Sequence, residues 1–281
     1  MNNFSSQVKK ELSELNNLAN KDNVKAEIKG YLLTIDGNVF STSSKYNINR
    51  FAKLLSNLYI NDYKISMKGN NFQISVKKNS IDEYRNYVIE SNNYEQLRSL
   101  IRGAFLGSGT ITDPKNMYHL EIIFENEENA NYINEVLVNF EVKSNLTKRD
   151  SKYIVYIEEG ESISNFLALI SANKGVLKFE NTRVIKDVRN KVNRLVNCET
   201  ANLNKTINSS VKQIEDIKYL KKIKKFNELT DKEKELANLR LKNPNASLLE
   251  LGNMLEPKLS KSGVNHRMNS ILKAAKRNGK D

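Results

Sequence analysis

The strongest constraint on the fold is a repeat of two helix-like segments that carry small residues on one face. In residues 22–34 and again in residues 94–107, a small residue recurs at every fourth position. The small residues are Ala26, Gly30 and Thr34 in the first segment, and Ser99, Gly103 and Gly107 in the second. Four-residue spacing places such residues on one side of a helix. A glycine inside a helix costs about 1 kcal/mol relative to alanine, so these glycines indicate two helices whose backbones approach closely.

The elements after each helix also repeat, which predicts two similar halves over residues 22–90 and 94–171. Each half reads as helix–strand–helix–strand–strand–helix, with room for one extra strand after its first helix. In the first half we expect strands at 38–42, 63–67 and 72–76, a helix at 49–58, and a last helix opened by a capping box over Ser80–Glu83. In the second half we expect strands at 118–124, 144–147 and 153–157, and helices at 128–139 and 162–170. An amphipathic helix over residues 3–18 precedes both halves.

The charge of the chain is concentrated in its last third. The net charge is +12, yet residues 1–182 contain 22 basic and 22 acidic residues. Residues 183–226 contain 12 basic and 4 acidic residues, and apolar residues at helical spacing run through this stretch. A neutral body followed by a basic segment indicates a nucleic-acid-binding protein with a local footprint. A charge that serves only solubility is the alternative.

Three short helices follow, and the residues that begin and end them predict a helix-turn-helix. Thr230–Glu233 and Ser247–Glu250 both have capping-box spacing, and Asn243–Asn245 ends the first helix. Glu256-Pro257 ends the second helix, and the third begins near Ser260 and runs to about residue 276. A short turn between the second and third helices is typical of DNA-binding helix-turn-helix domains.

The outer face of the third helix carries side chains that suit DNA. Asparagine can bond adenine with two hydrogen bonds, serine and histidine can reach base edges, and lysine or arginine can bind guanine or phosphate. An ordinary solvated helix face is the alternative for these residues. The predicted DNA contacts are Ser260, Lys261, Ser262, Asn265, His266, Arg267, Asn269 and Lys273, with Arg189 and Arg194 upstream as phosphate contacts.

Several runs of sequence resemble the WhiA family, bacterial transcriptional regulators of sporulation and cell division. They are Ser247–Glu256, Leu259–Arg267, Arg189–Asn202, Tyr118–Glu121 and Arg102–Leu106, and the resemblance covers nearly the whole chain. It implies an α+β domain of the LAGLIDADG homing-endonuclease fold, with two αββαββα-type halves, joined by a long helical linker to an all-α helix-turn-helix domain. We therefore predict a LAGLIDADG-like domain over 1–182, a basic helical linker over 183–226 and a DNA-binding domain over 227–281.

The resemblance also raises the question of nuclease activity. Homing endonucleases of this fold place one acidic residue at the end of each central helix, where it holds a divalent metal at the scissile phosphate. The corresponding positions here are Ile35 and Ser108. Asp36 comes one position late and reads as a turn residue before Gly37, while Asp113 lies well beyond the second helix. We therefore expect a degenerate domain without catalytic or metal-binding residues, and no cofactor.

The remaining composition excludes other classes. One cysteine, Cys198, excludes an internal disulfide or a multi-cysteine metal site, and two histidines do not suffice for a histidine metal centre. No stretch approaches the length of a membrane span, and the first residues have no apolar segment of a secretory signal. We expect a protein of the cytoplasm that associates with the nucleoid.

The function predicted from sequence is that of a non-catalytic, sequence-specific DNA-binding regulator of cell-division or sporulation genes. Its expected partner is double-stranded DNA, with another transcription regulator or RNA polymerase as a further candidate, and with no membrane or small-molecule substrate. Two alternatives remain open at this point. One is a nucleoid-associated architectural protein, and the other is a metal-dependent homing endonuclease with displaced acids.

Overall fold

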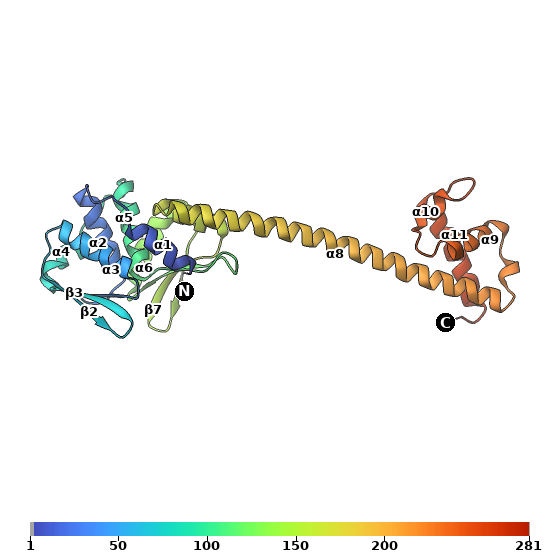
Figure 1. The fold of residues 1–281 in the computed structure, drawn as a ribbon, viewed down its shortest axis with the longest axis horizontal. Helices are drawn as coiled ribbons and strands as arrows, with labels where there is room; N and C mark the ends of the chain where they lie inside the picture. The colour runs from blue at the N-terminus through green and yellow to red at the C-terminus, as the bar shows by residue number, and fades with distance from the viewer. Residues whose placement is uncertain (1–2, 281) are drawn as a thin grey trace. The chain divides into compact units, whose positions relative to one another are not determined.

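The computed structural model describes residues 3–280, and their contacts divide the chain into two compact units. The first unit extends to Val188, and the second begins at Arg189. One long helix, α8 (Asn173–Lys222), contributes its beginning to the first unit and the rest to the second (Figure 1). Each unit has its own hydrophobic core.

The first unit is an α+β domain with two antiparallel sheets. Its helices before α8 are α1 (Phe4–Ser13), α2 (Lys21–Leu33), α3 (Lys45–Asn57), α4 (Asp82–Arg85), α5 (Tyr94–Ser108), α6 (Glu127–Asn139) and α7 (Gly160–Leu169), with a 3-10 turn η1 (Lys78–Ser80). Its strands are β1 (Val39–Thr42), β2 (Tyr63–Lys68), β3 (Asn71–Val76), β4 (Thr110–Ile111), β5 (Leu120–Phe124), β6 (Asn145–Arg149) and β7 (Lys152–Ile157). The predicted repeat is therefore confirmed as two helix-and-sheet halves.

The two sheets differ by one strand. The first has the order β1-β3-β2, and the second has the order β4-β5-β7-β6. In the second sheet Ile122 pairs with Val155, and Val155 pairs with Leu146, so one face of the sheet packs into the core. The extra strand for which the sequence left room forms only after α5, as the two-residue strand β4. The described part of the first half has no counterpart to it.

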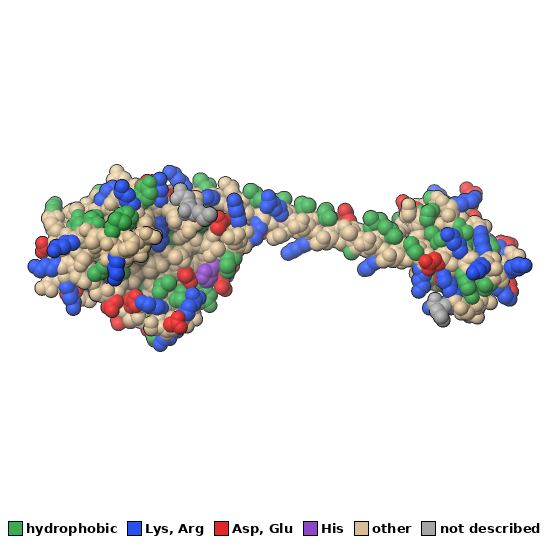
Figure 2. Space-filling model, turned by 60° about the horizontal axis from the view of Figure 1, so that its bottom comes forward, with side chains coloured by type: hydrophobic (Ala, Val, Ile, Leu, Met, Phe, Trp, Pro, Cys, Tyr) green, Lys and Arg blue, Asp and Glu red, His purple; other side chains and the backbone are tan. Residues whose placement is uncertain are grey.

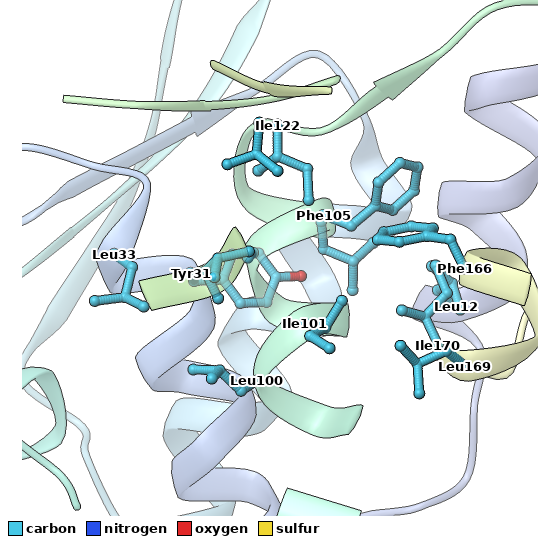
Figure 3. Close-up of a cluster of buried hydrophobic side chains, with 14 of the residues drawn as sticks. Leu12, Tyr31, Leu33, Leu100, Ile101, Phe105, Ile122, Phe166, Leu169 and Ile170 are labelled. Carbon is cyan, nitrogen blue, oxygen red and sulfur yellow. The ribbon is translucent and has the colours of Figure 1, made fainter. Parts of the chain in front are cut away.

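Helices α2 and α5 pack against each other at the centre of the first unit through their glycines. A Cβ atom added at Gly30 would overlap the backbone of Leu100 and Ala104, and one added at Gly103 would overlap the backbone of Glu27. Only hydrogen side chains therefore fit at this crossing. Apolar side chains from both helices, from α7 and from β5 surround the crossing, including Tyr31, Phe105, Phe166 and Ile122 (Figure 3).

A buried charge cluster links three helices beside this crossing. The Glu27 carboxylate accepts hydrogen bonds from Arg50 at 2.8 and 2.9 Å and from Arg102 at 3.1 Å, and all three side chains are almost fully buried. Arg50 also donates to the carbonyl of Leu15, and Arg102 donates to the carbonyl of Ile170. Removing one member of such a cluster leaves an uncompensated buried charge, so the cluster fixes how α2, α3 and α5 fit together.

The second unit packs three short helices on the end of α8. They are α9 (Asp231–Lys242), α10 (Leu248–Asn253) and α11 (Lys261–Arg277), preceded by the 3-10 turn η2 (Phe226–Glu228). Ile217 and Leu220 of α8 belong to the same core as Leu236, Leu251 and Met268. The end of α8 is thus part of this domain and not only a connection to it.

Polar contacts tie the chain end and the α9–α10 loop to α8. The Tyr219 hydroxyl donates to the carbonyl of Asn278 at 2.8 Å, and Lys280 pairs with Asp216 at 2.5 Å. The Ser210 hydroxyl donates to the carbonyl of Pro244. The buried Arg240 donates to carbonyls of the same loop, and its burial lowers the pKa of its guanidinium.

Most helix starts agree with the sequence, with two exceptions: α3 begins at Lys45, four residues before the expected position, and α4 lacks its expected cap. The capping boxes predicted at Thr230 and Ser247 are confirmed, because each side chain binds the backbone three residues later and receives the reciprocal glutamate bond. The capping box predicted at Ser80 is wrong. Ser80 ends the turn η1, and α4 begins after Ile81 without a side-chain cap.

Among residues 3–280, no helix combines the length and apolar character needed to cross a bilayer.

We expect Gly103→Ala to lower the stability of the first unit by about 3 kcal/mol, because the new methyl group would force α2 and α5 apart. Gly175→Ala is the matched control, since the nearest neighbours of its Cβ would be side-chain atoms and not backbone, with a methyl group of Val8 nearest at 3.2 Å. It should change stability by less than about 1 kcal/mol. Urea unfolding followed by tyrosine fluorescence tests this, because only Tyr219 of the 12 tyrosines lies in the second unit. An equal loss of stability in both variants would contradict the inference that the backbone contact at Gly103 leaves no room for a side chain.

Candidate nucleic-acid interface

The turn between α10 and α11 is built from a glycine and a serine cap. Gly252 accepts a hydrogen bond from the amide of Leu259 at 3.0 Å, and a Cβ at this glycine would overlap the Leu259 carbonyl. The Ser260 hydroxyl then caps α11 by accepting from the amide of Gly263 at 3.2 Å. This geometry places α11 as the second helix of a helix-turn-helix, the helix that enters the major groove in such domains.

One face of α11 is apolar and buried, and the other is polar and exposed. Val264, Met268, Ile271 and Ala275 are fully buried. The exposed side carries polar residues at intervals of four, three, four and three, which keeps them in one stripe. They are Ser262, His266, Asn269, Lys273 and Lys276. Helix α11 is thus amphipathic, and its polar side chains are exposed at the surface.

A groove of about 490 Å³ lies between the exposed side of α11 and the side of α8 at Lys212. Of the described residues that line it, three are lysines and none is acidic. The lining residues are Lys212, His266, Asn269, Ser270, Leu272, Lys273 and Lys276. A concave, basic surface of this kind can hold a polyanion and present hydrogen-bond donors to it.

Two of the residues predicted to contact DNA have other roles in the structure. Ser260 is the helix cap, and its hydroxyl lies 2.9 Å from that of Ser262. Arg267 is half-buried and donates to the carbonyl of Lys232 in α9. It also lies beside Glu233. Burial alone would raise the pKa of the Glu233 carboxyl, but hydrogen bonds from Ser270 and Thr230 and the positive charge of Arg267 lower this pKa. Lys261, Ser262, Asn265, His266, Asn269 and Lys273 are exposed.

The two upstream arginines do not share a side of α8. Residues five positions apart on a helix differ by about 140° in direction, so Arg189 and Arg194 point to different sides. Arg194 and Lys212 are 18 positions apart, which is a whole number of turns, and Lys205 lies within about 20° of both. Arg194 and Lys205 therefore extend the basic side of α8 from the groove, whereas Arg189 does not.

Of the seven groove residues, the predicted contacts included His266, Asn269 and Lys273, and the four that were missed include the lysines Lys212 and Lys276. Lys276 continues the polar stripe of α11 and could have been found from its spacing alone. Lys212 lies in another helix, 54 positions before His266, and no pattern in the sequence pairs it with α11. Only the packing of α8 on the helix-turn-helix brings it there.

Two family models match the chain in the order in which the two units occur. The WhiA LAGLIDADG-like domain matches residues 97–189, and the WhiA C-terminal helix-turn-helix domain matches residues 192–275. A protein of Caldicellulosiruptor saccharolyticus named "Probable cell division protein WhiA" is 40% identical over 250 residues, which is 85% of this chain and 75% of that protein. The chain belongs to the WhiA family. The helix-turn-helix match begins inside α8, in agreement with the shared core of the second unit.

Other WhiA proteins and structures extend the comparison. The protein of the same name from Clostridium acetobutylicum is 48% identical over 181 residues, 64% of this chain, and the alignment spans 57% of that protein's length. A crystal structure of full-length WhiA from Thermotoga maritima has a TM-score of 0.64 and 26% identity, and covers 99% of this chain and all of that one. A crystal structure of a WhiA LAGLIDADG domain has a TM-score of 0.53 at 22% identity, covers 60% of this chain and 93% of that one, and shows the same fold.

At the ends of the two central helices, Ser108 and Ile35 contact the protein itself. The Ser108 hydroxyl donates to the carbonyl of Ile123 at 2.6 Å and accepts from its amide at 3.0 Å, so it joins α5 to β5. Ile35 packs against the core. The Arg85 guanidinium donates to the carbonyls of Leu32, Ile35 and Gly37, which places a cation at the end of α2.

Two further side chains complete this account. His119 lies just before β5, between Glu121 and Glu158, and stacks on Tyr156. Among residues 3–280, no cluster of three histidine, cysteine or acidic side chains is arranged to hold a metal ion. Cys198 is exposed on α8.

Proposed function

We propose that this protein is a sequence-specific, non-catalytic regulator of transcription that acts on genes of cell division and sporulation. The observation that carries the proposal is the acid-free groove between α8 and α11, because it joins a polar helix face to three lysines. In this proposal α11 lies in the major groove of double-stranded DNA. A helix about 10–12 Å wide fits a groove about 12 Å wide.

The side chains of the groove and of the polar stripe of α11 divide by their chemistry. Ser262, His266 and Asn269 are short and polar, and they occupy the first half of α11, where helix-turn-helix proteins read base edges. Lys212, Lys273 and Lys276 are long point charges that suit phosphate oxygens. Arg194 and Lys205 continue the phosphate contacts along α8. Base readout thus rests on α11, and sequence-independent affinity rests on both helices.

The cellular setting follows from the same proposal. A protein that binds chromosomal DNA acts in the cytoplasm at the nucleoid. Contact with another transcription regulator or with RNA polymerase would turn DNA binding into regulation. The names of the relatives connect the family with cell division, which supports cell-division genes as targets.

We expect Ser262→Ala combined with His266→Ala to remove the preference for the cognate site. Each lost base contact should cost about 1–3 kcal/mol on that site and little on random duplex. The ratio of specific to non-specific affinity is the measurement, on sites taken from chromosome-wide mapping of bound DNA. Asn238→Ala on the exposed side of α9 is the control and should keep the ratio. A ratio near one in the unmodified protein would instead favour an architectural DNA-binding protein.

We expect Arg194→Ala and Lys212→Ala to weaken binding equally on all duplexes. Each phosphate contact releases counterions, so each variant should reduce the slope of log affinity against log salt by about 0.9. Lys218→Ala is the matched control, because Lys218 is exposed on α8 but points about 120° away from Lys212. The slope should be unchanged in this control. If the salt slope is unchanged in Arg194→Ala and Lys212→Ala as well as in the control, the DNA phosphates contact other residues.

We expect no strand cleavage with Mg²⁺ or Mn²⁺ on bound plasmid or linear duplex. Ile35 and Ser108 provide no carboxylate ligands, and Arg85 opposes a second cation at the end of α2. A gel assay at saturating protein is the measurement, with Asp36→Ala as the control. Metal-dependent nicking that disappears in Asp36→Ala would show that the chemistry survives with a displaced acid.

A further inference from the structure

Strand β2 lies at the edge of the first sheet, and its outer side is open. The sheet order β1-β3-β2 places β3 on one side of β2, and in the part of the chain that the structure describes no strand pairs with its other side. Every residue of β2 after Tyr63 is exposed. An open edge strand of this kind can accept a further strand from another chain through main-chain hydrogen bonds.

The open main-chain groups of β2 belong to Ile65 and Met67. The amide of Lys77 donates to the carbonyl of Asp62 at 2.9 Å, so the even-numbered residues of β2 bond to β3. Hydrogen-bonded and non-hydrogen-bonded pairs alternate along an antiparallel ladder, so the N–H and C=O groups of Ile65 and Met67 point away from β3. Two donors and two acceptors are therefore available to an added strand.

The side chains of Ile65 and Met67 extend the apolar face of the sheet past its core. Ile65 lies opposite the buried Ile74, and Met67 lies opposite Phe72, which packs against the core. Ile65 is nevertheless 54% exposed, and Met67 is 64% exposed. Directly opposite residues share a face of a sheet, so apolar side chains in an added strand would cover both of them.

The other face of β2 is basic. It carries Lys64 and Lys68 and no acidic residue, and residues 61–78 contain four lysines and one acidic residue. That acidic residue is Asp62, which pairs with Lys77. Basic and apolar side chains both reach the surface of the first unit on the face shown in Figure 2. Lysines on an edge strand disfavour pairing with another basic strand and favour pairing with an acidic one.

A hollow at the start of β2 leaves room on this basic face. It has a volume of about 560 Å³, and its lining includes Lys64, Ser75, Lys77 and Asp62. Lys64 and Ser75 are paired across the two strands and so share the basic face. A carboxylate opposite Lys64 in an added strand would point to this same face.

We propose that the edge of β2 binds an extended, acidic segment of a partner protein, which adds a fourth strand to the first sheet. The segment has acidic residues opposite Lys64 and Lys68, and apolar residues opposite Ile65 and Met67. The position opposite Ser66 takes any residue. Duplex DNA would use the lysines but neither the open main-chain groups nor the apolar side chains, so a peptide accounts for more of this surface.

Binding of a synthetic peptide to the full chain, followed by fluorescence anisotropy, is the test. The probe is a fluorescein-labelled peptide with the core Glu-Ile-Thr-Val-Glu, and the control peptide has lysine in place of both glutamates. The control should bind about ten-fold more weakly, because like charges then meet at Lys64 and Lys68. Hydrogen exchange at the amides of Ile65 and Met67 should slow in the complex with the acidic peptide.

Two proline variants separate pairing at this edge from general effects on the sheet. Ile65→Pro removes an outward N–H and should abolish binding, while the bonds from β2 to β3 remain, since proline is tolerated where the N–H of an edge strand faces solvent. Ser41→Pro in β1 is the matched control. The amide of Val76 donates to the carbonyl of Asn38, so the N–H of Ser41 also points outward, at the opposite edge. This control should bind the peptide unchanged, and circular dichroism checks that both variants fold.

A charge exchange tests the proposal without a proline. Lys64→Glu combined with Lys68→Glu should bind the lysine peptide more tightly than the acidic one. An acidic peptide that does not bind the unmodified chain, or that binds Ile65→Pro as tightly, would overturn the proposal. So would an equal loss of DNA affinity and peptide affinity in Ile65→Pro, which would assign the edge to DNA. A dimer of the unmodified chain in sedimentation equilibrium that Ile65→Pro dissolves would also overturn it, because the edge would then pair with a second copy.

Discussion

Helices α2 and α5 meet at Gly30 and Gly103, and the rest of the first unit is arranged around this crossing. Because backbone touches backbone, the two helices can take only a narrow range of positions relative to each other. Each helix leads into one half of the domain, so the crossing also fixes how the two halves combine. The buried Glu27 cluster adds a second constraint beside the first, since its two arginines come from α3 and α5. The two features together explain how a nearly repeated sequence forms one domain.

The ends of the two central helices are stabilised by bonds to the protein itself. Ser108 satisfies backbone groups of β5, and Arg85 binds the last carbonyls of α2. The packing of these helices depends on their small residues, so it is independent of the groups at the helix ends.

Helix α8 has a different surface on each side. Its last turns pack into the core of the helix-turn-helix, where Ile217 and Leu220 are fully buried. Between residues 189 and 212, one side carries Arg194, Lys205 and Lys212 and no acidic residue, and the opposite side carries exposed apolar residues. The basic side continues into the groove at α11, so the helix enlarges the surface proposed to bind DNA. The same helix is thus part of the domain core and part of the surface proposed to bind DNA.

The sequence by itself determined the order of elements, the glycine crossing, two of the three predicted capping boxes and the two faces of α11. These features depend on residues close together in the chain, whose spacing shows directly in a helix or a turn. The tertiary structure decided what depends on distant residues. Packing places Lys212 beside α11 and Arg267 against α9. It also makes Ser260 the cap of α11, and β4 forms only in the second half. The failed cap at Ser80 has the same origin, because the chain there follows a 3-10 turn and α4 starts one residue later. Spacing predicts which side chains share a face, but only packing decides what that face meets.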